Sequence, residues 1–272
     1  MSCLPVHIAL FTYREGSLMK IGVIGIGAIG GVIARRLVTT GHEVRVANSR
    51  GAEAVRDFAN KIGATATDVK GAVDGVDVVV LSIPYSAVQQ LPKGLFDNLS
   101  SSATIIDTGN YYPNVRDPSV PEINAGKTES VWVSEQIGRP VIKAFNILFS
   151  ETVEQAAKPE GAAGRLAIAV AGDDAEQKKT AMRIVNEVGF DPVDAGSLDD
   201  SWRQQPGSPC YSCDFDAEQL RAALAAAIKG VPEKNRDYFL AHLGTFLGGV
   251  PTRERMVSIQ RLINNPTWPV TS

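Results

Sequence analysis

The residues best suited to binding a ligand form a glycine-rich turn at Gly25, Gly27 and Gly30, spaced as G-x-G-x-x-G. The first glycine allows a tight turn, the second lets a pyrophosphate approach the backbone, and the third lets a helix pack closely on a strand. The N–H groups and positive dipole end of that helix favour the pyrophosphate. The alternative is a structural turn without a ligand. We expect a dinucleotide site made by Gly25, Ile26, Gly27, Ala28 and Ile29.

The residues after the next expected strand select the cofactor. An NAD site usually has an acidic residue there, which holds the ribose 2′-hydroxyl. Here the strand is followed by Asn48, Ser49 and Arg50, with no carboxylate to repel a 2′-phosphate. Ser49 can donate a hydrogen bond to that phosphate, and Arg50 can form a charge-assisted pair with it. We therefore expect NADP(H) rather than NAD(H), the alternative being that Arg50 is a solvated loop charge.

The elements that must position these residues alternate between strands and helices. Apolar runs rich in β-branched residues predict strands at 20–24, 43–47, 64–66, 76–83, 103–107, 140–145, 166–171 and 192–194. Helical spacing predicts helices at 28–40, 52–61, 69–73, 86–91 and 130–136, and one that ends at 188. Asp173 and Glu176 are spaced as the capping box of that last helix. The alternation predicts an α/β fold, with a Rossmann-type, doubly wound, mostly parallel sheet.

Beyond residue 196 the pattern changes to a helical region. An irregular polar segment is followed by a helix capped by Asp216 and Gln219, and by helices at 233–243 and 252–263. We thus divide the chain into an N-terminal extension (1–18), an NADP-binding Rossmann domain (19–196) and a C-terminal helical region (197–272) that caps the substrate or forms a dimer interface. Residues 6–13 form either an extra edge strand or part of an extension upstream of a start at Met19; we expect a poorly ordered extension.

The composition limits the class of protein and its partners. The formal net charge of −3 over 272 residues gives no argument for nucleic acid or an anionic membrane. No apolar run approaches the roughly 20 residues that a membrane-spanning helix needs. Three cysteines make no disulfide framework, so a reducing cytoplasm is expected. Cys210 and Cys213 have no second pair that would complete a zinc site, and we expect no metal.

Two strand ends supply further candidates, because the carboxyl ends of strands face the ligand crevice of a doubly wound sheet. Pro84 has no N–H and ends one strand after Ser82 and Ile83, so this segment is expected to border the nicotinamide. Asn110 follows another strand and offers both a donor and an acceptor. A turn role for Asn110 is the alternative.

Several segments together resemble the NADP oxidoreductases that depend on the deazaflavin coenzyme F-420. They are the glycine turn with Ser49 and Arg50, the strand end 82–84, above all residues 140–146, and residues 189–196. The cytosolic reductase domain of the six-transmembrane ferric reductases is similar too. The resemblance covers residues 19–196. It implies a nicotinamide near Ser82, Ile83, Pro84 and Ala144, and hydride transfer to a flavin-like ring that needs little acid–base help from the protein.

Two residues are catalytic candidates if the acceptor is a small carbonyl compound. Lys143 with Asn146 resembles the lysine–asparagine pair of β-hydroxyacid dehydrogenases, in which lysine is the general acid and base. There the pair has four-residue spacing on a helix, whereas here the spacing is three on an expected strand, which would place Lys143 and Asn146 on opposite faces. The alternative is a strand lysine satisfied by a carboxylate or by solvent. Lys143 or Asn110 would polarise the carbonyl oxygen.

The leading hypothesis is therefore an NADP(H)-dependent oxidoreductase whose acceptor is flavin-like or a deazaflavin. The alternatives are an NADP-dependent reductase of a small carbonyl compound, and a non-catalytic protein that senses NADP(H). In the helical region, Trp202, Arg203 and Tyr211 could cap the nicotinamide crevice, and His242 is the histidine best placed to reach a substrate. We expect a homodimer, with a small molecule or a flavin-like coenzyme as the other partner.

Overall fold

The computed structural model describes residues 17–247 and 252–265, so residues 1–16 of the expected N-terminal extension lie outside it. Six parallel strands form one sheet in the order β3-β2-β1-β4-β5-β6. This is the strand order of a Rossmann sheet, and it confirms the predicted α/β fold. The strands are β1 (Lys20–Ile24), β2 (Glu43–Ala47), β3 (Thr65–Ala66), β4 (Val78–Leu81), β5 (Thr104–Asp107) and β6 (Ile142–Lys143).

A second, two-stranded parallel sheet extends the first. It consists of β7 (Ala167–Val170) and β8 (Asp191–Asp194). An antiparallel bridge joins it to β6, because the amide of Lys143 donates to the oxygen of Ala171 at 2.8 Å and the amide of Ala171 donates back at 3.0 Å. The α/β alternation therefore continues to about residue 196, as predicted, but the last two strands meet the main sheet in the opposite direction.

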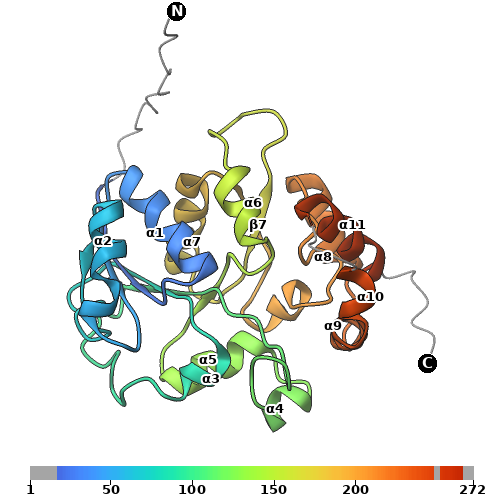
Figure 1. Cartoon of the computed structure of the whole chain (residues 1–272), viewed down its shortest axis with the longest axis horizontal. Coiled ribbons are helices and arrows are strands. Elements are labelled where there is room, and N and C mark those ends of the chain that lie inside the picture. The colour runs from blue at the N-terminus through green and yellow to red at the C-terminus, as the bar shows by residue number, and fades with distance from the viewer. Residues whose placement is uncertain (1–16, 248–251, 266–272) are drawn as a thin grey trace, which may run out of the picture.

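Helices cover both faces of the sheet, and two hydrophobic clusters fill the two interfaces (Figure 1). The first cluster includes side chains of α1 (Ala28–Thr39), α6 (Ser150–Gln155) and α7 (Ala175–Val188), with α2 (Arg56–Ile62) beside them. The second includes side chains of α3 (Tyr85–Val88), α4 (Pro121–Asn124) and α5 (Glu129–Ile137). Both faces of β4 and β5 are buried, which explains their unbroken apolar runs.

The C-terminal region is helical, as predicted, and gathers at one end of the molecule (Figure 1). Buried leucines of its first helix join the first cluster. Within the described ranges, none of the helices is both long enough and apolar enough to cross a membrane. The remaining elements are η1 (Ala52–Val55), η2 (Asp199–Gln204), α8 (Ala217–Ala226), α9 (Val231–Ala241), α10 (Leu243–Leu247) and α11 (Arg253–Ile263).

Three local predictions were wrong. The strand expected at 140–145 is reduced to β6, and Phe145 has a φ of +64°, which no strand residue adopts. Residues 69–73 form hydrogen-bonded turns instead of a helix. The cap of α7 is Asp174, whose carboxylate accepts from the amides of Glu176 and Gln177. Asp173 instead accepts from the amide of Leu198 at 2.9 Å.

Candidate active site

The glycine turn between β1 and α1 has one glycine that faces open space. Gly25 has a φ of +96°, and a Cβ there would lie 2.1 Å from the oxygen of Ser82. A Cβ on Gly30 would lie 2.0 Å from the oxygen of Gly25. A Cβ on Gly27 would meet nothing within 4 Å. The chain's own packing therefore explains Gly25 and Gly30, whereas the open space at Gly27 is where a ligand would approach the backbone.

The N-terminus of α1 offers donors to that space. Its first internal hydrogen bond runs from the amide of Gly31 to the oxygen of Gly27 at 2.9 Å. The N–H groups before Gly31 thus have no helical acceptor, and Gly27 caps the helix without a side-chain bond. Ala28 is exposed, and Ile26 and Ile29 are half-buried. These donors and the helix dipole fit the pyrophosphate of a dinucleotide.

The segment after β2 lies beside this turn, because the amide of Gly25 donates to the oxygen of Ala47 at 2.8 Å. The side chain of Asn48 accepts from the amide of Arg50 at 2.8 Å, which fixes the loop. Ser49 and Arg50 are exposed. Arg50 forms no ion pair with any residue that the structure describes. Its charge is therefore free to pair with a 2′-phosphate.

The carboxyl ends of β4, β5 and β6 lie side by side. The amide of Thr108 donates to the oxygen of Leu81, and the amide of Ala144 donates to the oxygen of Asp107, both at 3.1 Å. Of the residues expected near the nicotinamide, Pro84 is exposed, Ser82 and Ile83 are half-buried, and Ala144 is buried. The side chain of Ala144 can thus support the ligand site from behind but is not exposed in it.

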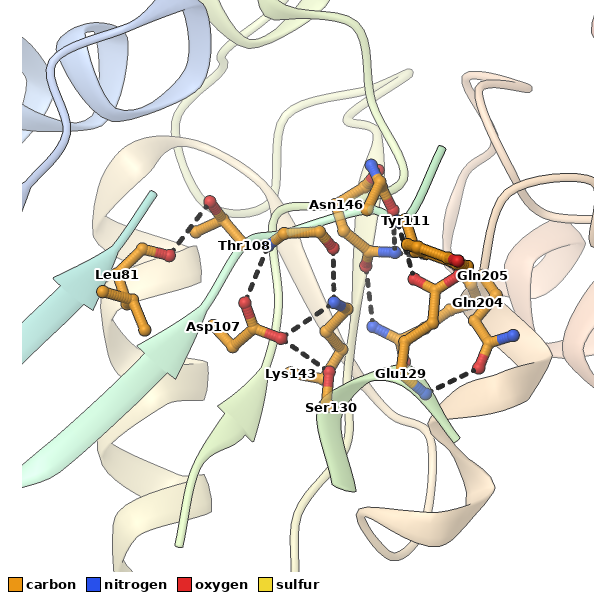
Figure 2. A network of polar contacts seen from close by, with 12 residues as sticks. Leu81, Asp107, Thr108, Tyr111, Glu129, Ser130, Lys143, Asn146, Gln204 and Gln205 are labelled. Carbon is orange, nitrogen blue, oxygen red and sulfur yellow. Dashed lines mark hydrogen bonds and ion pairs between the residues drawn. The ribbon is translucent and has the colours of Figure 1, made fainter. Parts of the chain in front are cut away.

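A buried ion pair lies under this edge, between Lys143 of β6 and Asp107 of β5 (Figure 2). The ammonium of Lys143 donates to Asp107 Oδ2 at 3.0 Å and to the oxygen of Gly109. Asp107 also accepts from the hydroxyl of Ser130 at 2.7 Å and from the amide of Gly109 at 2.8 Å. The side chain of Lys143 is 0 % exposed. It is therefore placed to fix the end of β5, and its ammonium does not reach the surface of the site.

Two asparagines and a glutamine join the segments that follow β5 and β6 to η2, and Figure 2 labels Asn146 and Gln204 of this group. Asn146 donates to Asn110 Oδ1 at 3.1 Å and to the oxygen of Gln204 at 2.6 Å. Gln204 returns a bond from Nε2 to Asn146 Oδ1 at 3.0 Å. Asn110 is half-buried, while Asn146 and Gln204 are buried. The side chains of Lys143 and Asn146 thus have separate partners and do not act on one another.

Two tyrosines complete the edge. Tyr112 follows β5, Tyr211 belongs to the C-terminal region, and their hydroxyls are hydrogen bonded to each other. Asn110 Nδ2 donates to the Tyr211 hydroxyl at 3.3 Å. The guanidinium of Arg116 lies over the Tyr112 ring, 5.1 Å from its centre. Burial, and then the neighbouring Tyr211, raise the pKa of Tyr112 well above its ordinary value, so both phenols are protonated at neutral pH.

Glu129 is a buried carboxyl group behind these residues. Its Oε2 accepts from the amide of Tyr111 at 3.1 Å, and its own amide donates to Gln205 at 3.1 Å. Burial raises the pKa of Glu129 to about 7, although the charges of Lys143 and Arg236 act in the opposite direction. Glu129 is 0 % exposed, so it contacts the site only through Tyr111 and its neighbours.

The other residues that the sequence suggested either lie away from this strand end or are buried thiols. Arg203 stacks on Trp202 and donates to the oxygen of Leu224 at 3.3 Å, so it faces α8. His242 ends α9 and packs on Tyr238, with ring centres 4.3 Å apart. Cys210 and Cys213 are buried free thiols whose pKa values are raised by burial. Of the three residues expected to cap the crevice, it is Tyr211 that contacts the strand end.

Three residues of the site escaped the sequence analysis. Asp107 ends a strand that was predicted, but its partners Ser130 and Lys143 lie 23 and 36 residues away. Gln204 lies 58 residues from Asn146. Tyr112 has one sequence signal, its place shortly after the end of β5, but its partner is 99 residues away. Contacts between residues so far apart in the sequence can be identified only from the folded structure.

Comparison with known proteins identifies relatives of this chain. Residues 20–111 match the family described as NADP oxidoreductase, coenzyme F420-dependent. The chain is 45% identical over 112 residues to the protein YjhV of Escherichia coli K12. These 112 residues are 41% of this chain, and the match covers 79% of that protein.

Two crystal structures share the fold. One is a hypothetical protein from Sinorhizobium meliloti, with a TM-score of 0.62 and 26% identity over 73% of this chain and 95% of that one. The other, described as a candidate F420-dependent NADP reductase from Arthrobacter sp. FB24, has a TM-score of 0.55 and 20% identity over 66% of this chain and 86% of that one. The chain therefore belongs to one family with the E. coli protein and is an NAD(P)-dependent oxidoreductase, and the match to the family of NADP oxidoreductases is confined to residues 20–111.

Proposed function

We propose that the protein is an NADPH-dependent reductase that transfers hydride to an acceptor at the carboxyl edge of β4, β5 and β6. The observation that carries the proposal is the joint placement of Gly27 and Arg50. Gly27 faces open space at a helix start that has no side-chain cap. Arg50 lies in the loop after β2, which is next to the glycine turn, and has no carboxylate partner among the described residues. These features fit a pyrophosphate and a 2′-phosphate respectively.

The residues for the nicotinamide follow from the same placement. Ser82, Ile83 and Pro84 end the strand next to β1, so they lie beside the glycine turn, and Ser82 donates its amide to the oxygen of Ile24 at 2.9 Å. When bound, the nicotinamide supplies the hydride, and the chain's task is to orient it and the acceptor.

The first candidate acceptor is a flavin-like ring or a deazaflavin. The family description of residues 20–111 supports it, as does the resemblance of residues 140–146. A second candidate is a small carbonyl compound, and one observation favours it: the paired hydroxyls of Tyr112 and Tyr211 beside Asn110. A carbonyl acceptor needs a proton as well as a hydride, and phenols can donate one.

The test is NADPH oxidation, followed by the nicotinamide absorbance, against two sets of acceptors. The first set is the deazaflavin coenzyme, FMN, FAD and ferric chelates, and the second is a panel of small aldehydes, ketones and 2-oxo acids. Turnover with either set supports the reductase and identifies the acceptor class. Tight NADPH binding without turnover in either set would overturn the reductase and favour a protein that senses NADP(H). Failure to bind NADPH would overturn both proposals.

A further inference from the structure

We propose that Tyr112 is the proton donor of this reductase, with Tyr211 as the residue that orients and recharges it. The inference rests on the proposed NADPH-dependent function and deepens it, because it specifies an acceptor with a C=O or C=N bond. The geometry points to these phenols because their hydroxyls are bonded to each other and that of Tyr211 also accepts from Asn110.

The direction of the bonds starts at Asn110. Its Nδ2 donates to the oxygen of Asn146 at 2.9 Å, and its Oδ1 accepts from Asn146 at 3.1 Å, so the amide orientation is fixed. The same Nδ2 donates to the Tyr211 hydroxyl at 3.3 Å. A phenol has one proton to give. The Tyr211 oxygen accepts from Asn110, and either phenol can be the donor in the bond between them. The proposed step uses the arrangement in which Tyr211 donates to Tyr112.

This arrangement leaves the proton of Tyr112 without an acceptor among the described residues. In this arrangement the Tyr112 hydroxyl accepts from Tyr211, and no further bond of that hydroxyl is found within residues 17–247 and 252–265. Tyr112 is half-buried, whereas Tyr211 is 9 % exposed. Tyr112 is therefore the more exposed of the two tyrosines, and we assign it the side of the acceptor.

The surroundings keep this proton on the phenol until it is needed. The charged and titratable groups that act on Tyr112 are Arg116 over its ring, Tyr211 at its hydroxyl, and the more remote Glu129. Burial, together with the effects of these groups, raises the pKa of Tyr112. The guanidinium of Arg116 also donates to the oxygen of Asn110 and pairs with Asp117 at 3.0 Å, which holds the loop of Tyr112 against β5.

The proposed step balances in atoms and charge. The hydride adds with its electron pair to the carbon of the C=O or C=N group, and the π bond of that group breaks. The freed electron pair on oxygen or nitrogen takes the proton of Tyr112. The acceptor is reduced and NADPH is oxidised. Tyr112 then takes the proton of Tyr211, and one proton from solvent restores the pair.

The first test observes the phenols directly and needs no turnover. The protein has six tyrosines, and ring-¹³C labelling gives each a nuclear magnetic resonance signal that responds to hydrogen bonding of its hydroxyl. Tyr112→Phe and Tyr211→Phe assign the two signals. Pyruvate, butyraldehyde and cyclohexanone are then added to the NADP⁺ complex. We expect at least one of them to shift the Tyr112 signal. Tyr238 of α9, which packs on His242, is the control signal and should not move.

The second test is kinetic, with the carbonyl compound that shifts the signal. Tyr112→Phe should lower kcat by roughly 10²–10⁴-fold, the usual contribution of a general acid, with little change in KM. The decline of kcat at alkaline pH should disappear with it. Tyr211→Phe should move that alkaline limb and lower kcat less, because Tyr112 keeps a proton of its own. Tyr238→Phe should leave both constants unchanged.

The outcomes separate the two proposals. If NADP⁺ binds but no carbonyl compound moves the Tyr112 signal, or if Tyr112→Phe turns over like the wild type, the proton donor is overturned. In that case reduction of FMN or the deazaflavin at equal rates in both proteins would leave the proposed function standing. If NADP⁺ and NADPH fail to bind, both proposals fall.

Discussion

Asn110 and Asn146 exchange hydrogen bonds across the carboxyl edge of the sheet. Asn146 Nδ2 donates to Asn110 Oδ1 at 3.1 Å, and Asn110 Nδ2 donates to the oxygen of Asn146 at 2.9 Å. The exchange ties the segment after β5 to the segment after β6, and it directs Asn110 towards Tyr211 at 3.3 Å. A rigid edge of this kind places an acceptor more accurately than a free loop would.

Gly27 and Gly30 predict opposite consequences for the same substitution. Gly27→Ala should leave the free energy of unfolding within about 0.5 kcal/mol of the wild type, because its φ of −69° suits alanine and a Cβ meets nothing. It should nevertheless weaken NADPH binding by about tenfold or more, which is about 1.4 kcal/mol. Calorimetric titration and thermal unfolding measure the two quantities.

Gly30→Ala is the matched control. Its Cβ would lie 2.0 Å from the backbone oxygen of Gly25, so it should destabilise the fold by about 1–3 kcal/mol. Equal loss of stability in the two variants would contradict the assignment of open space to the ligand.

Lys143→Met tests whether the buried lysine is structural. The change leaves the carboxylate of Asp107 buried without its cation, which should cost about 3–5 kcal/mol in the free energy of unfolding. Lys178→Met is the control, because its ion pair with the more exposed Asp194 should be worth about 1 kcal/mol or less. Chemical denaturation measures both. A Lys143 variant that is as stable as the wild type but inactive would favour the catalytic role instead.

Glu129→Gln should change how stability depends on pH. The folded pKa of Glu129, about 7, lies above its ordinary value of 4.5, so the fold favours the neutral acid. That contribution to stability is complete below pH about 4.5 and is lost as the pH rises through about 7. Glutamine keeps the neutral form at every pH.

The free energy of unfolding of Glu129→Gln should therefore grow relative to the wild type across that interval, by about 3 kcal/mol. Denaturant titrations at several pH values give the difference directly. A difference that stays constant from acid to neutral pH would show that Glu129 titrates normally.

The predictable part of the fold is the part set by local patterns. The glycine spacing at Gly25 to Gly30 implies a strand before it and a helix after it, and both are present as β1 and α1. The capping box of Asp216 and Gln219 was equally local, and it is confirmed at the start of α8. Such features depend on residues within one turn of each other.

The wrong predictions arise where distant contacts decide. Asp173 has the right spacing to Glu176 for a cap, but the amide of Leu198 takes its carboxylate, and Asp174 caps the helix. The run 140–145 is apolar enough for a strand, yet the strand ends at Lys143, which bonds to Ala171 directly after β7. Neither competitor is adjacent in the sequence.

The residues that we propose for the cofactor could be chosen from the sequence, whereas those that we propose for the acceptor could not. Gly27, Ser49 and Arg50 belong to a single βαβ unit, so their spacing alone indicates the role that we propose for them. Tyr112 and Tyr211 are 99 residues apart, and Gln204 and its partner Asn146 are 58 residues apart, so these pairs meet only in the folded chain. Lys143 resembles a catalytic lysine in the sequence because its ion-pair partner Asp107 lies 36 residues away.

Calorimetric titration of NADPH and NADH tests most directly whether Gly27 and Arg50 bind NADPH. The wild type should bind NADPH more tightly than NADH, and Arg50→Ala should weaken NADPH binding by roughly 10–100-fold, the loss of about 1.5–3 kcal/mol from one charge-assisted contact. NADH binding should hardly change. Equal affinity for the two nucleotides, unaltered in Arg50→Ala, would contradict the account.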